Sequence, residues 1–561
     1  MTDVLAGHLL VSCLIDQGVE LAFGVPGESY LAVLDGLYAE RERLRFVHCR
    51  HEGGAAFMAE AYGKLTGRPG VCMVTRGPGA CNAAIGVHTA YQDSTPLVLL
   101  VGDVGAAMRD REAFQEVDFA ALFGPGTRGM AKRVERIDDP ARIPEAVRRA
   151  FATALNGRPG PAVLVLPEDM LARRVPEPPR LSRVVPTRPA CDPVALERVA
   201  DMLRAAQRPF VIAGGSSWTP AGARALETFA AAWSIPVGNA FRFQDTFDNR
   251  HPQYAGDVGI AINPRLAAHI AEADLVLAIG VRLGEMTTSG YTLLQAPRAR
   301  QQLVHVHPDA LELDRVYVAD VAICAGAEAA ARALADLPAP TAPPWQAWAG
   351  QCHADYLANL QGPLPPAGAL QMREVIAVLE RLLPADAVLT NGAGNFASWL
   401  HRFFRYRGLS AGARTQLAPT NGAMGYGVPA GIAANLASGR LAVTFTGDGD
   451  FLMNGQELAT AALHGARSIV ILVNNGGYGT IRMHQERNYP GRVSATGLAN
   501  PDFCALARAH GWQAHRVEAT EQFEPALRAA LHSAQGTLIE LMLPMDVITT
   551  RATLQQLRRA D

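Results

Sequence analysis

The stretch that decides the fold is residues 441–480, LAVTFTGDGDFLMNGQELATAALHGARSIVILVNNGGYGT. It opens with a short apolar, β-branched run that ends at the GDG of residues 447–449. A second apolar run, residues 468–473, ends at the NN of residues 474–475, and residues 454–464 between them have the spacing of a helix. This order of strand, helix and strand predicts a parallel βαβ unit, in which both strand ends lie at one edge of the sheet.

Two oxygen-bearing side chains are therefore expected to converge at that edge. Asp448 offers a carboxylate oxygen, Asn475 offers an amide oxygen, and the glycines that follow leave a backbone carbonyl free. Such hard oxygen ligands, completed by a diphosphate, suit Mg²⁺. Gly449 would let the backbone approach phosphate oxygens closely. A lone GDG is also a common turn, but GDG followed about 25 residues later by NN, with a strand before each, is far more specific.

This combination resembles the fingerprint of the thiamine diphosphate (ThDP) enzymes, which is GDG, a spacer of this length, and NN. The resemblance implies that Asp448, Asn475 and the carbonyl of Gly477 bind Mg²⁺. It also implies further cofactor contacts, at Gly447, Gly449, Asp450 and Tyr478.

The whole chain has the composition of an ordinary globular protein of several domains. It has 561 residues, 19% charged residues and a formal net charge of −2, so nothing in it favours nucleic acid or an acidic membrane surface as a partner. The eight cysteines show no CxxC pair and no metal-ligand spacing, as expected of reduced, buried thiols. The N-terminal residues lack the pattern of a signal peptide, so we expect a cytoplasmic location.

Residues 1–170 alternate strand-like and helical stretches, which predicts a doubly wound parallel sheet. One strand delivers Arg50-His51-Glu52 to the start of a helix rich in small residues. On the residues alone, Glu52 is a first-turn glutamate stabilised by the helix dipole. The same segment is similar to the RHE segment of ThDP enzymes of the acetolactate synthase type. In that family the glutamate contacts the cofactor's aminopyrimidine and promotes removal of the proton at C2, which implies that Glu52 is catalytic.

Three further segments of this domain resemble the same family, at the spacing from Glu52 that the family has. They are the VPG of residues 25–27, the TRGPGACN of residues 75–82 and the AFQE of residues 113–116. Gln115 is expected to face the substrate, where an amide donates to a developing oxyanion, although a polar loop residue is the alternative. The implied cofactor contacts are Val25, Pro26, Gly27, Pro78 and Asn82, and the implied substrate contacts are Phe114 and Gln115.

The last domain contributes two more loops by the same resemblance. Gly394, Asn395 and Phe396 follow a predicted strand and are implied as diphosphate contacts. Met424 is by its type a core residue, but its G-x-M-G context implies a wedge that holds the two cofactor rings in proton-transfer reach. The Gly422 carbonyl is implied to accept a hydrogen bond from the cofactor's amino group.

The predicted architecture is α/β, with three doubly wound domains that contain parallel sheets. The boundaries are a pyrimidine-binding domain at 1–170, a linker at 171–190, a central Rossmann-like domain at 191–340, a linker at 341–368, a diphosphate-binding domain at 369–545 and a tail at 546–561. The tail is expected to be a solvated helix, and the alternative is a cap over the active site. The central domain matches the FAD-binding segments of acetolactate synthases only in part, at residues 280–286 and 306–309, so FAD is not favoured.

The resemblance implies decarboxylation of a 2-oxo acid with carboligation, as in acetolactate synthase. Arg482 and His484 depart from that family's pattern and are candidates for contact with a polar or anionic substrate, or else solvated loop charges. The alternatives are therefore a ThDP-dependent decarboxylase or C–C lyase that acts on such a substrate, and a non-catalytic protein of the same fold. In this family the cofactor lies between two subunits, which implies a homodimer or homotetramer.

Overall fold

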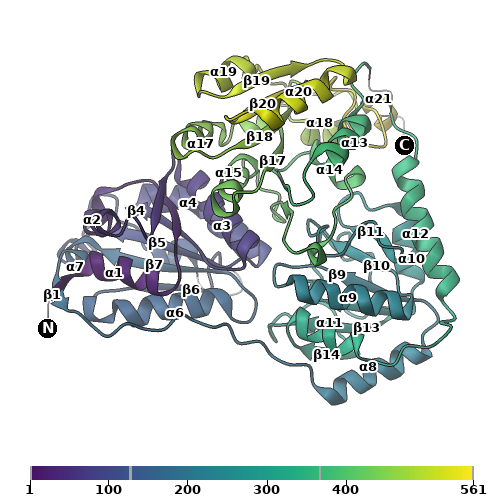
Figure 1. Ribbon diagram of the computed structural model, residues 1–561, viewed down its shortest axis with the longest axis horizontal. Helices are drawn as coiled ribbons and strands as arrows, with labels where there is room; N and C mark the ends of the chain where they lie inside the picture. The colour runs from purple at the N-terminus through teal and green to yellow at the C-terminus, as the bar shows by residue number, and fades with distance from the viewer. Residues whose placement is uncertain (1–2, 125–128, 366–367, 559–561) are drawn as a thin grey trace.

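The computed structural model describes residues 3–124, 129–365 and 368–558, and within them the chain forms three domains in order (Figure 1). Each domain contains a six-stranded sheet whose strand pairs are all parallel, with helices on both faces. This confirms the predicted fold class. None of the described helices is long and apolar enough to cross a lipid bilayer.

The first domain has the strand order β3-β2-β4-β5-β7-β6. The strand order reverses between β2 and β4, and an open α/β sheet binds ligands at such a point. The strands are β2 (Leu21–Gly24), β3 (Arg45–His48), β4 (Gly70–Thr75), β5 (Leu97–Asp103), β6 (Arg133–Arg136) and β7 (Pro161–Pro167). The helices are α1 (Ala6–Asp16), α2 (Leu31–Ala39), α3 (Glu52–Thr66), α4 (Arg76–Asp93), α5 (Phe119–Phe123), α6 (Ile143–Leu155) and α7 (Glu168–Leu171).

The central domain has the order β11-β10-β9-β12-β13-β14. Its strands are β9 (Pro209–Ala213), β10 (Val237–Ala240), β11 (Tyr254–Val258), β12 (Leu275–Ile279), β13 (Gln302–His307) and β14 (Val321–Cys324). Its helices are α8 (Pro193–Ala205), α9 (Pro220–Trp233), α10 (Pro264–Glu272) and α11 (Ala327–Ala335).

The last domain has the order β16-β15-β17-β18-β20-β19, which reverses between β15 and β17. Its strands are β15 (Val388–Asn391), β16 (Gln416–Leu417), β17 (Ala442–Gly447), β18 (Ser468–Asn474), β19 (Gln513–Val517) and β20 (Thr537–Met542). Its helices are α13 (Met372–Leu382), α14 (Ala397–Phe403), α15 (Gly427–Ser438), α16 (Asp448–Phe451), α17 (Leu458–His464), α18 (Gly479–Asn488), α19 (Phe503–Ala509), α20 (Thr520–His532) and α21 (Leu554–Leu557).

Both predicted linkers contain regular structure. Within 171–190, β8 (Arg174–Pro176) pairs antiparallel with β1 (Asp3–Leu5) at the chain's N-terminal end. Within 341–368, α12 (Gln346–Gln361) forms a helix of 16 residues, and residues 366–367 lie outside the described part. The buried positions Ala349, Cys352 and Tyr356 follow the three- and four-residue spacing of a helix, which explains why this stretch folds.

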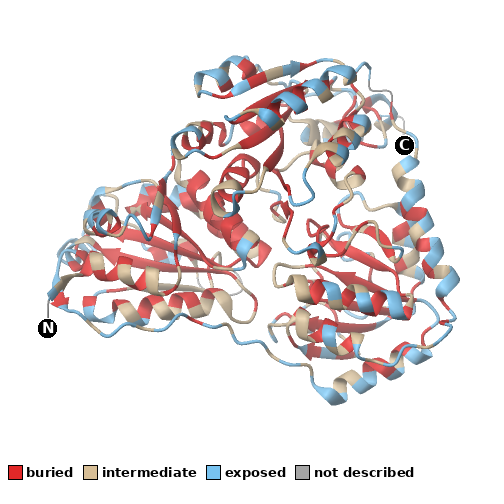
Figure 2. Cartoon of the chain, viewed as in Figure 1, coloured by how far each residue is buried: buried red, intermediate tan, exposed pale blue. Residues whose placement is uncertain are grey.

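The first and last domains share one hydrophobic core within the chain. Helices α3 and α15 pack against each other between the two sheets, and both are almost entirely buried (Figures 1 and 2). The Phe57 and Tyr426 rings meet edge to face with centroids 5.4 Å apart, and the Tyr426 hydroxyl donates to Glu60 at 2.5 Å. The position of each domain is therefore fixed relative to the other.

Candidate functional site

A cavity of about 230 Å³ lies where the strand order of the last sheet reverses. The loops that follow β15, β17 and β18 form its walls, and we call it the switch-point cavity. Every residue that the sequence assigned to a site in this domain, Arg482 and His484 excepted, lines it. These residues are Gly394, Asn395, Phe396, Gly422, Met424, Gly447, Asp448, Gly449, Asp450, Asn475, Gly477 and Tyr478.

The Asp448 carboxylate is buried and held by four donors. Its Oδ1 accepts from the Gly449 amide at 2.9 Å, and its Oδ2 accepts from the amides of Gly476 and Gly477 at 2.8 and 3.1 Å. Asn500 completes the set through Nδ2, at 2.8 Å from Oδ2. These contacts fix the direction of the carboxylate before any ligand binds, because rotation would leave buried amides without an acceptor.

Asn500 is a site residue that the sequence reasoning missed. Its Nδ2 bridges Asp448 and the side-chain oxygen of Asn474, while its own Oδ1 is buried and has no hydrogen-bond partner within the described chain. A buried amide oxygen without a partner beside a carboxylate is what a site for a hydrated cation would contain. No local pattern marks Asn500, because it reaches Asp448 from 52 residues away.

Asp450 joins three loops of the cavity through its side chain. Its Oδ1 accepts from the amides of Gly425 and Ala393, at 2.9 and 3.1 Å, and its Oδ2 accepts from the Thr446 hydroxyl at 2.6 Å. Burial raises the pKa of Asp450 to about 6. A Cβ at Gly392 would lie 2.1 Å from Oδ1, so a glycine is required there for this carboxylate to fit.

The loop that carries Gly422 and Met424 is held from outside its own domain. Lys64 of the first domain donates to the Ala418 carbonyl at 2.8 Å, and Arg242 of the central domain donates to the Pro419 carbonyl. Asp93 accepts from the Thr420 amide at 2.7 Å and also pairs with Lys64. All three domains therefore contribute to the placement of this wall.

The site residues predicted in the first domain form a second group at the ends of β2, β3 and β4. Asn82 donates through Nδ2 to Glu52 Oε2 at 2.9 Å, and Glu52 itself is only partly buried. Gln115 has a left-handed backbone with φ of 65°, and its carbonyl accepts from the Gly77 amide at 2.9 Å. Phe114 is 72% exposed. Among the described residues, none of this group lines the switch-point cavity: Val25, Pro26, Gly27, Glu52, Pro78, Asn82, Phe114 and Gln115.

Arg482 forms an ion pair within its own helix, α18. Its guanidinium pairs with Glu486 at 2.8 Å, and the fully buried Glu486 also binds Arg558 of the C-terminal segment at 2.6 and 2.7 Å. The Arg558 guanidinium, first among several donors, lowers the pKa of Glu486 to about 2. Arg482 is therefore neither a solvated charge nor unpaired, and its contact with a substrate stays a prediction. His484 is exposed, and neither side chain lines the cavity.

The described residues of the C-terminal tail are docked beside the cavity and are not solvated, which agrees with the alternative expectation for this segment. Helix α21 packs against α18, and the buried side chains of Val547 and Ile548 form part of the cavity wall. Residues 559–561 of the predicted tail lie outside the described part of the chain. The docking depends on the Arg558–Glu486 pair, whose partners are 72 residues apart, so no local spacing encodes it.

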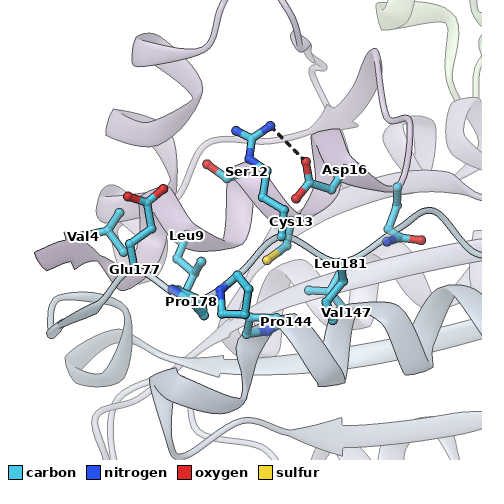
Figure 3. Close-up of a pocket in the computed structure, with 13 residues that line it drawn as sticks. Val4, Leu9, Ser12, Cys13, Asp16, Pro144, Val147, Glu177, Pro178 and Leu181 are labelled. Carbon is cyan, nitrogen blue, oxygen red and sulfur yellow. Dashed lines mark ion pairs between the residues drawn. The ribbon is translucent and has the colours of Figure 1, made fainter. Parts of the chain in front are cut away.

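Two further cavities contain none of the residues that the sequence assigned to a site. One, of about 590 Å³, lies at the carboxyl edge of the central sheet, between the loops after β9, β13 and β14 and residues 64–67 of the first domain. A small cavity of about 30 Å³ lies beneath the segment 177–181, beside Cys13 and the Asp16–Arg180 ion pair of 3.4 Å (Figure 3). It holds little more than water. Asp502, Cys504 and Glu540 lie close enough together for a metal ion, but Arg516 binds both carboxylates, at 3.3 and 2.9 Å.

Comparison with known proteins matches all three domains to one family. Residues 5–122 match the thiamine pyrophosphate enzyme N-terminal TPP binding domain, 196–334 its central domain and 392–541 its C-terminal TPP binding domain. The acetolactate synthase large subunit of Parasynechococcus marenigrum is 32% identical over 549 residues, which are 95% of this chain and 86% of the relative. The acetolactate synthase isozyme 2 large subunit of Escherichia coli is 30% identical over 544 residues, 95% and 94% of the two chains.

Proposed function

The chain belongs to the thiamine pyrophosphate enzymes and is acetolactate synthase-like, and from this premise we propose that it decarboxylates a 2-oxo acid and joins the product to a second carbonyl compound. One observation supports the proposal most strongly. The predicted cofactor residues of the last domain line a single cavity at the sheet's switch point, with the Asp448 carboxylate already oriented.

The residues of the switch-point cavity fit thiamine diphosphate (thiamine pyrophosphate) with a divalent cation. A Cβ at Gly449 would lie 2.6 Å from the Tyr478 ring. Only glycine at this position therefore lets the backbone lie close to this ring and to a bound diphosphate. We assign Asp448, Asn475 and the Gly477 carbonyl as Mg²⁺ ligands, since they offer hard oxygen atoms. The amides of Gly449 and Asp450 would hold the diphosphate, and Gly394, Asn395 and Phe396 would close the opposite side.

When bound, ThDP supplies a carbon nucleophile that adds to a 2-oxo acid and accepts the electron pair released with CO₂. The chain's residues bind and orient it. Met424 projects from a loop that three domains hold, so it can support the two rings without moving. The Gly422 carbonyl would accept from the cofactor's amino group, which fixes that group's direction.

Glu52 would hold the proton that exchanges with the aminopyrimidine ring. Its Oε2 accepts from Asn82, so Oε1 is the atom left for this exchange. A carboxyl group performs this role best in a dry site, because water competes for the proton. Within one chain, however, Glu52 is only partly buried, and Asn82 and Pro78 are exposed. Gln115 would lie beside the reacting carbonyl as a donor.

A second copy of the chain would complete the site. None of the predicted site residues of the first domain lines the switch-point cavity within one chain, and Glu52 is only partly buried there. We therefore propose a homodimer, or a homotetramer built from such dimers, in which Glu52 of one protomer faces the cavity of its partner.

The proposal includes no FAD. At the carboxyl edge of the central sheet, Arg282 donates to Glu312 and to the Gln92 carbonyl at 3.2 and 3.0 Å, and Arg158 lies 3.6 Å from the same carboxylate. Burial is nearly complete for Arg158 and Glu312. Of these residues, Arg282 lies in a counterpart of the family's flavin segments, residues 280–286, and the ion pair with Glu312 engages it. Purified protein should show no flavin absorbance.

The test is incubation of purified protein with ThDP, Mg²⁺ and pyruvate while CO₂ and acetolactate are measured together. Formation of both in step, abolished by Glu52→Gln and by removal of the metal with EDTA, is the expected result. CO₂ with free aldehyde would instead identify a decarboxylase. Cofactor binding without turnover of pyruvate would indicate a different oxo acid, and cofactor binding without exchange of its C2 proton would indicate a non-catalytic protein.

A further inference from the structure

Glu457 is a buried carboxylate of the last domain that binds the first domain. It ends the 3-10 turn Gly455–Glu457, and its side chain is 0% exposed. Oε1 accepts from the backbone amides of Arg50 and His51, at 3.2 and 3.0 Å, while Oε2 accepts from the Thr460 hydroxyl at 2.5 Å. The two amides belong to the turn between β3 and α3, and the next residue is Glu52. We call residues 50–52 the glutamate turn.

The contact depends on a glycine in the first domain. A Cβ at Gly54 would lie 2.6 Å from Glu457 Oε1 and 2.9 Å from its Cδ. Any larger residue would push the carboxylate away from the two amides. The small residues at the start of α3 therefore have a specific purpose beyond helix packing, since they let a glutamate from another domain approach the helix end.

On the other side, Glu457 is connected to the switch-point cavity through a short, rigid segment. Asp448 lies only nine positions earlier in the chain. The Glu457 amide donates to the Asn454 carbonyl at 3.1 Å, and Asn454 Nδ2 donates to the Gly425 carbonyl of the Met424 loop at 3.0 Å. Phe451 fills the space beneath Gly455. Little freedom exists between the cavity wall and Glu457.

We propose that Glu457 is a positioning residue that fixes the direction in which Glu52 leaves the end of β3. This inference rests on the proposed role of Glu52. The Glu457 carboxylate links the glutamate turn to the wall of the switch-point cavity of the same chain, and we call this link the tie. Because Glu52 is proposed to serve the partner's cavity, the tie joins parts of two different active sites.

The tie has an energetic basis independent of any ligand. The Arg50 and His51 amides lie before the first hydrogen-bonded turn of α3, so the helix itself provides them with no acceptor. Without Glu457 these partly buried amides would need water or a new partner, and the turn would shift to find one. Such a shift moves the Glu52 side chain, which is a catalytic defect without loss of the cofactor cavity.

Hydrogen–deuterium exchange of the full-length protein without cofactor tests the tie directly. In Glu457→Ala, we expect the peptide that covers residues 45–54 to exchange about tenfold faster, while peptides over β17 and β18 are unchanged. Gly54→Ala should have the same effect from the opposite side. Glu457→Gln retains an acceptor oxygen and should stay near the wild-type rate. Glu518→Gln, an exposed position of the same domain, is the matched control.

Steady-state measurements then separate positioning from folding. For Glu457→Ala, kcat should fall about tenfold with KM for the oxo acid and the cofactor Kd within about twofold of wild type, and Glu457→Gln should restore most of the loss. Unchanged exchange of residues 45–54 in Glu457→Ala and Gly54→Ala would overturn the proposal, as would a defect confined to cofactor Kd. The exchange experiment uses neither cofactor nor substrate, so its failure is distinct from a failure of the proposed reaction.

Discussion

The switch-point cavity and the glutamate turn differ in how much of their surroundings a single chain supplies. The cavity is complete on one side, with Asp448 and Asp450 buried and each bonded to several donors. The glutamate turn is anchored from below by Glu457 but has exposed neighbours in Pro78 and Asn82. A single chain therefore orients the cofactor-binding residues of the cavity. The surroundings of Glu52 need a further surface to exclude water.

The largest effect should come from mixing two inactive variants. Glu52→Gln damages only the glutamate turn, and Asp448→Asn damages only the cavity. If each active site combines the two from different chains, co-expressed mixed dimers contain one intact site. Activity should then recover from near zero to about a quarter of wild type in the unfractionated mixture at equal expression, and to about half in purified mixed dimers.

Differently tagged chains, purified in sequence through both tags, isolate the mixed dimers for this assay. Recovery in the mixed dimers, with each homodimer inactive, would establish sites shared between chains. An absence of recovery in stable mixed dimers would show that the two regions act within one chain. The matched control pairs Glu52→Gln with itself under the two tags, and it should stay inactive.

Asp448→Asn alone should disrupt the hydrogen bonds that orient the metal-binding side of the cavity. In either orientation the amide nitrogen of the asparagine would face a donor, the Gly449 amide on one side or Gly476, Gly477 and Asn500 on the other, and the metal would lose its anionic ligand. We expect ThDP affinity in the presence of Mg²⁺ to fall about 100-fold, as measured by calorimetry. Near wild-type affinity would contradict the metal assignment. Asp546→Asn, near the chain's end, serves as a charge-matched control.

Arg558→Ala tests the part of the cavity wall that comes from the C-terminal segment. Loss of this guanidinium leaves Glu486 with Arg482 and a backbone amide, so α21 should detach more often and expose Val547 and Ile548. We expect the thermal midpoint to fall by about 2 °C and the cofactor Kd to rise about threefold. Arg551→Ala is a control in the same segment. Equal effects of both variants would contradict a specific role of the Arg558–Glu486 ion pair.

Whether the sequence predicts a residue of these two regions depends on how far apart in the chain its contacts lie. Asp448 and Asn475 follow adjacent parallel strands, so strand patterns and connection rules already bring them together. Asn500 and Ile548 reach the same place through packing of distant segments, which no local spacing encodes. Glu457 has the same character, since it sits in an ordinary helical run and its partners are about 400 residues away.

Some strands and helices are not predicted from the sequence for a related reason. The central strand β10 reads Val-Gly-Asn-Ala, which contains two residues that disfavour strands, yet it lies fully buried between β9 and β11. Its structure is determined by its neighbours. Helix α12 was hidden by the proline-rich stretch before it, although its buried positions repeat at helical spacing.

Asp450→Asn should have the smallest effect on cofactor affinity. Such a result would show that not every acidic residue of the cavity binds the metal. An asparagine Oδ1 can still accept from Gly425 and Ala393, and Thr446 can accept from the new amide instead of donating. Cofactor affinity should therefore stay within about threefold. Only the cost of burying a charge is removed.

That cost has a defined pH dependence. The folded pKa of Asp450, about 6, is raised above its usual value near 4, so the folded wild type binds more protons than the unfolded chain between these values. Wild-type stability from this group therefore falls as pH rises from about 4 to 6, by about 3 kcal/mol. The variant, measured by denaturant unfolding without cofactor, should match wild type below pH 4 and exceed it above pH 6. A variant that is less stable at every pH would show that the Asp450 charge itself holds the three loops together.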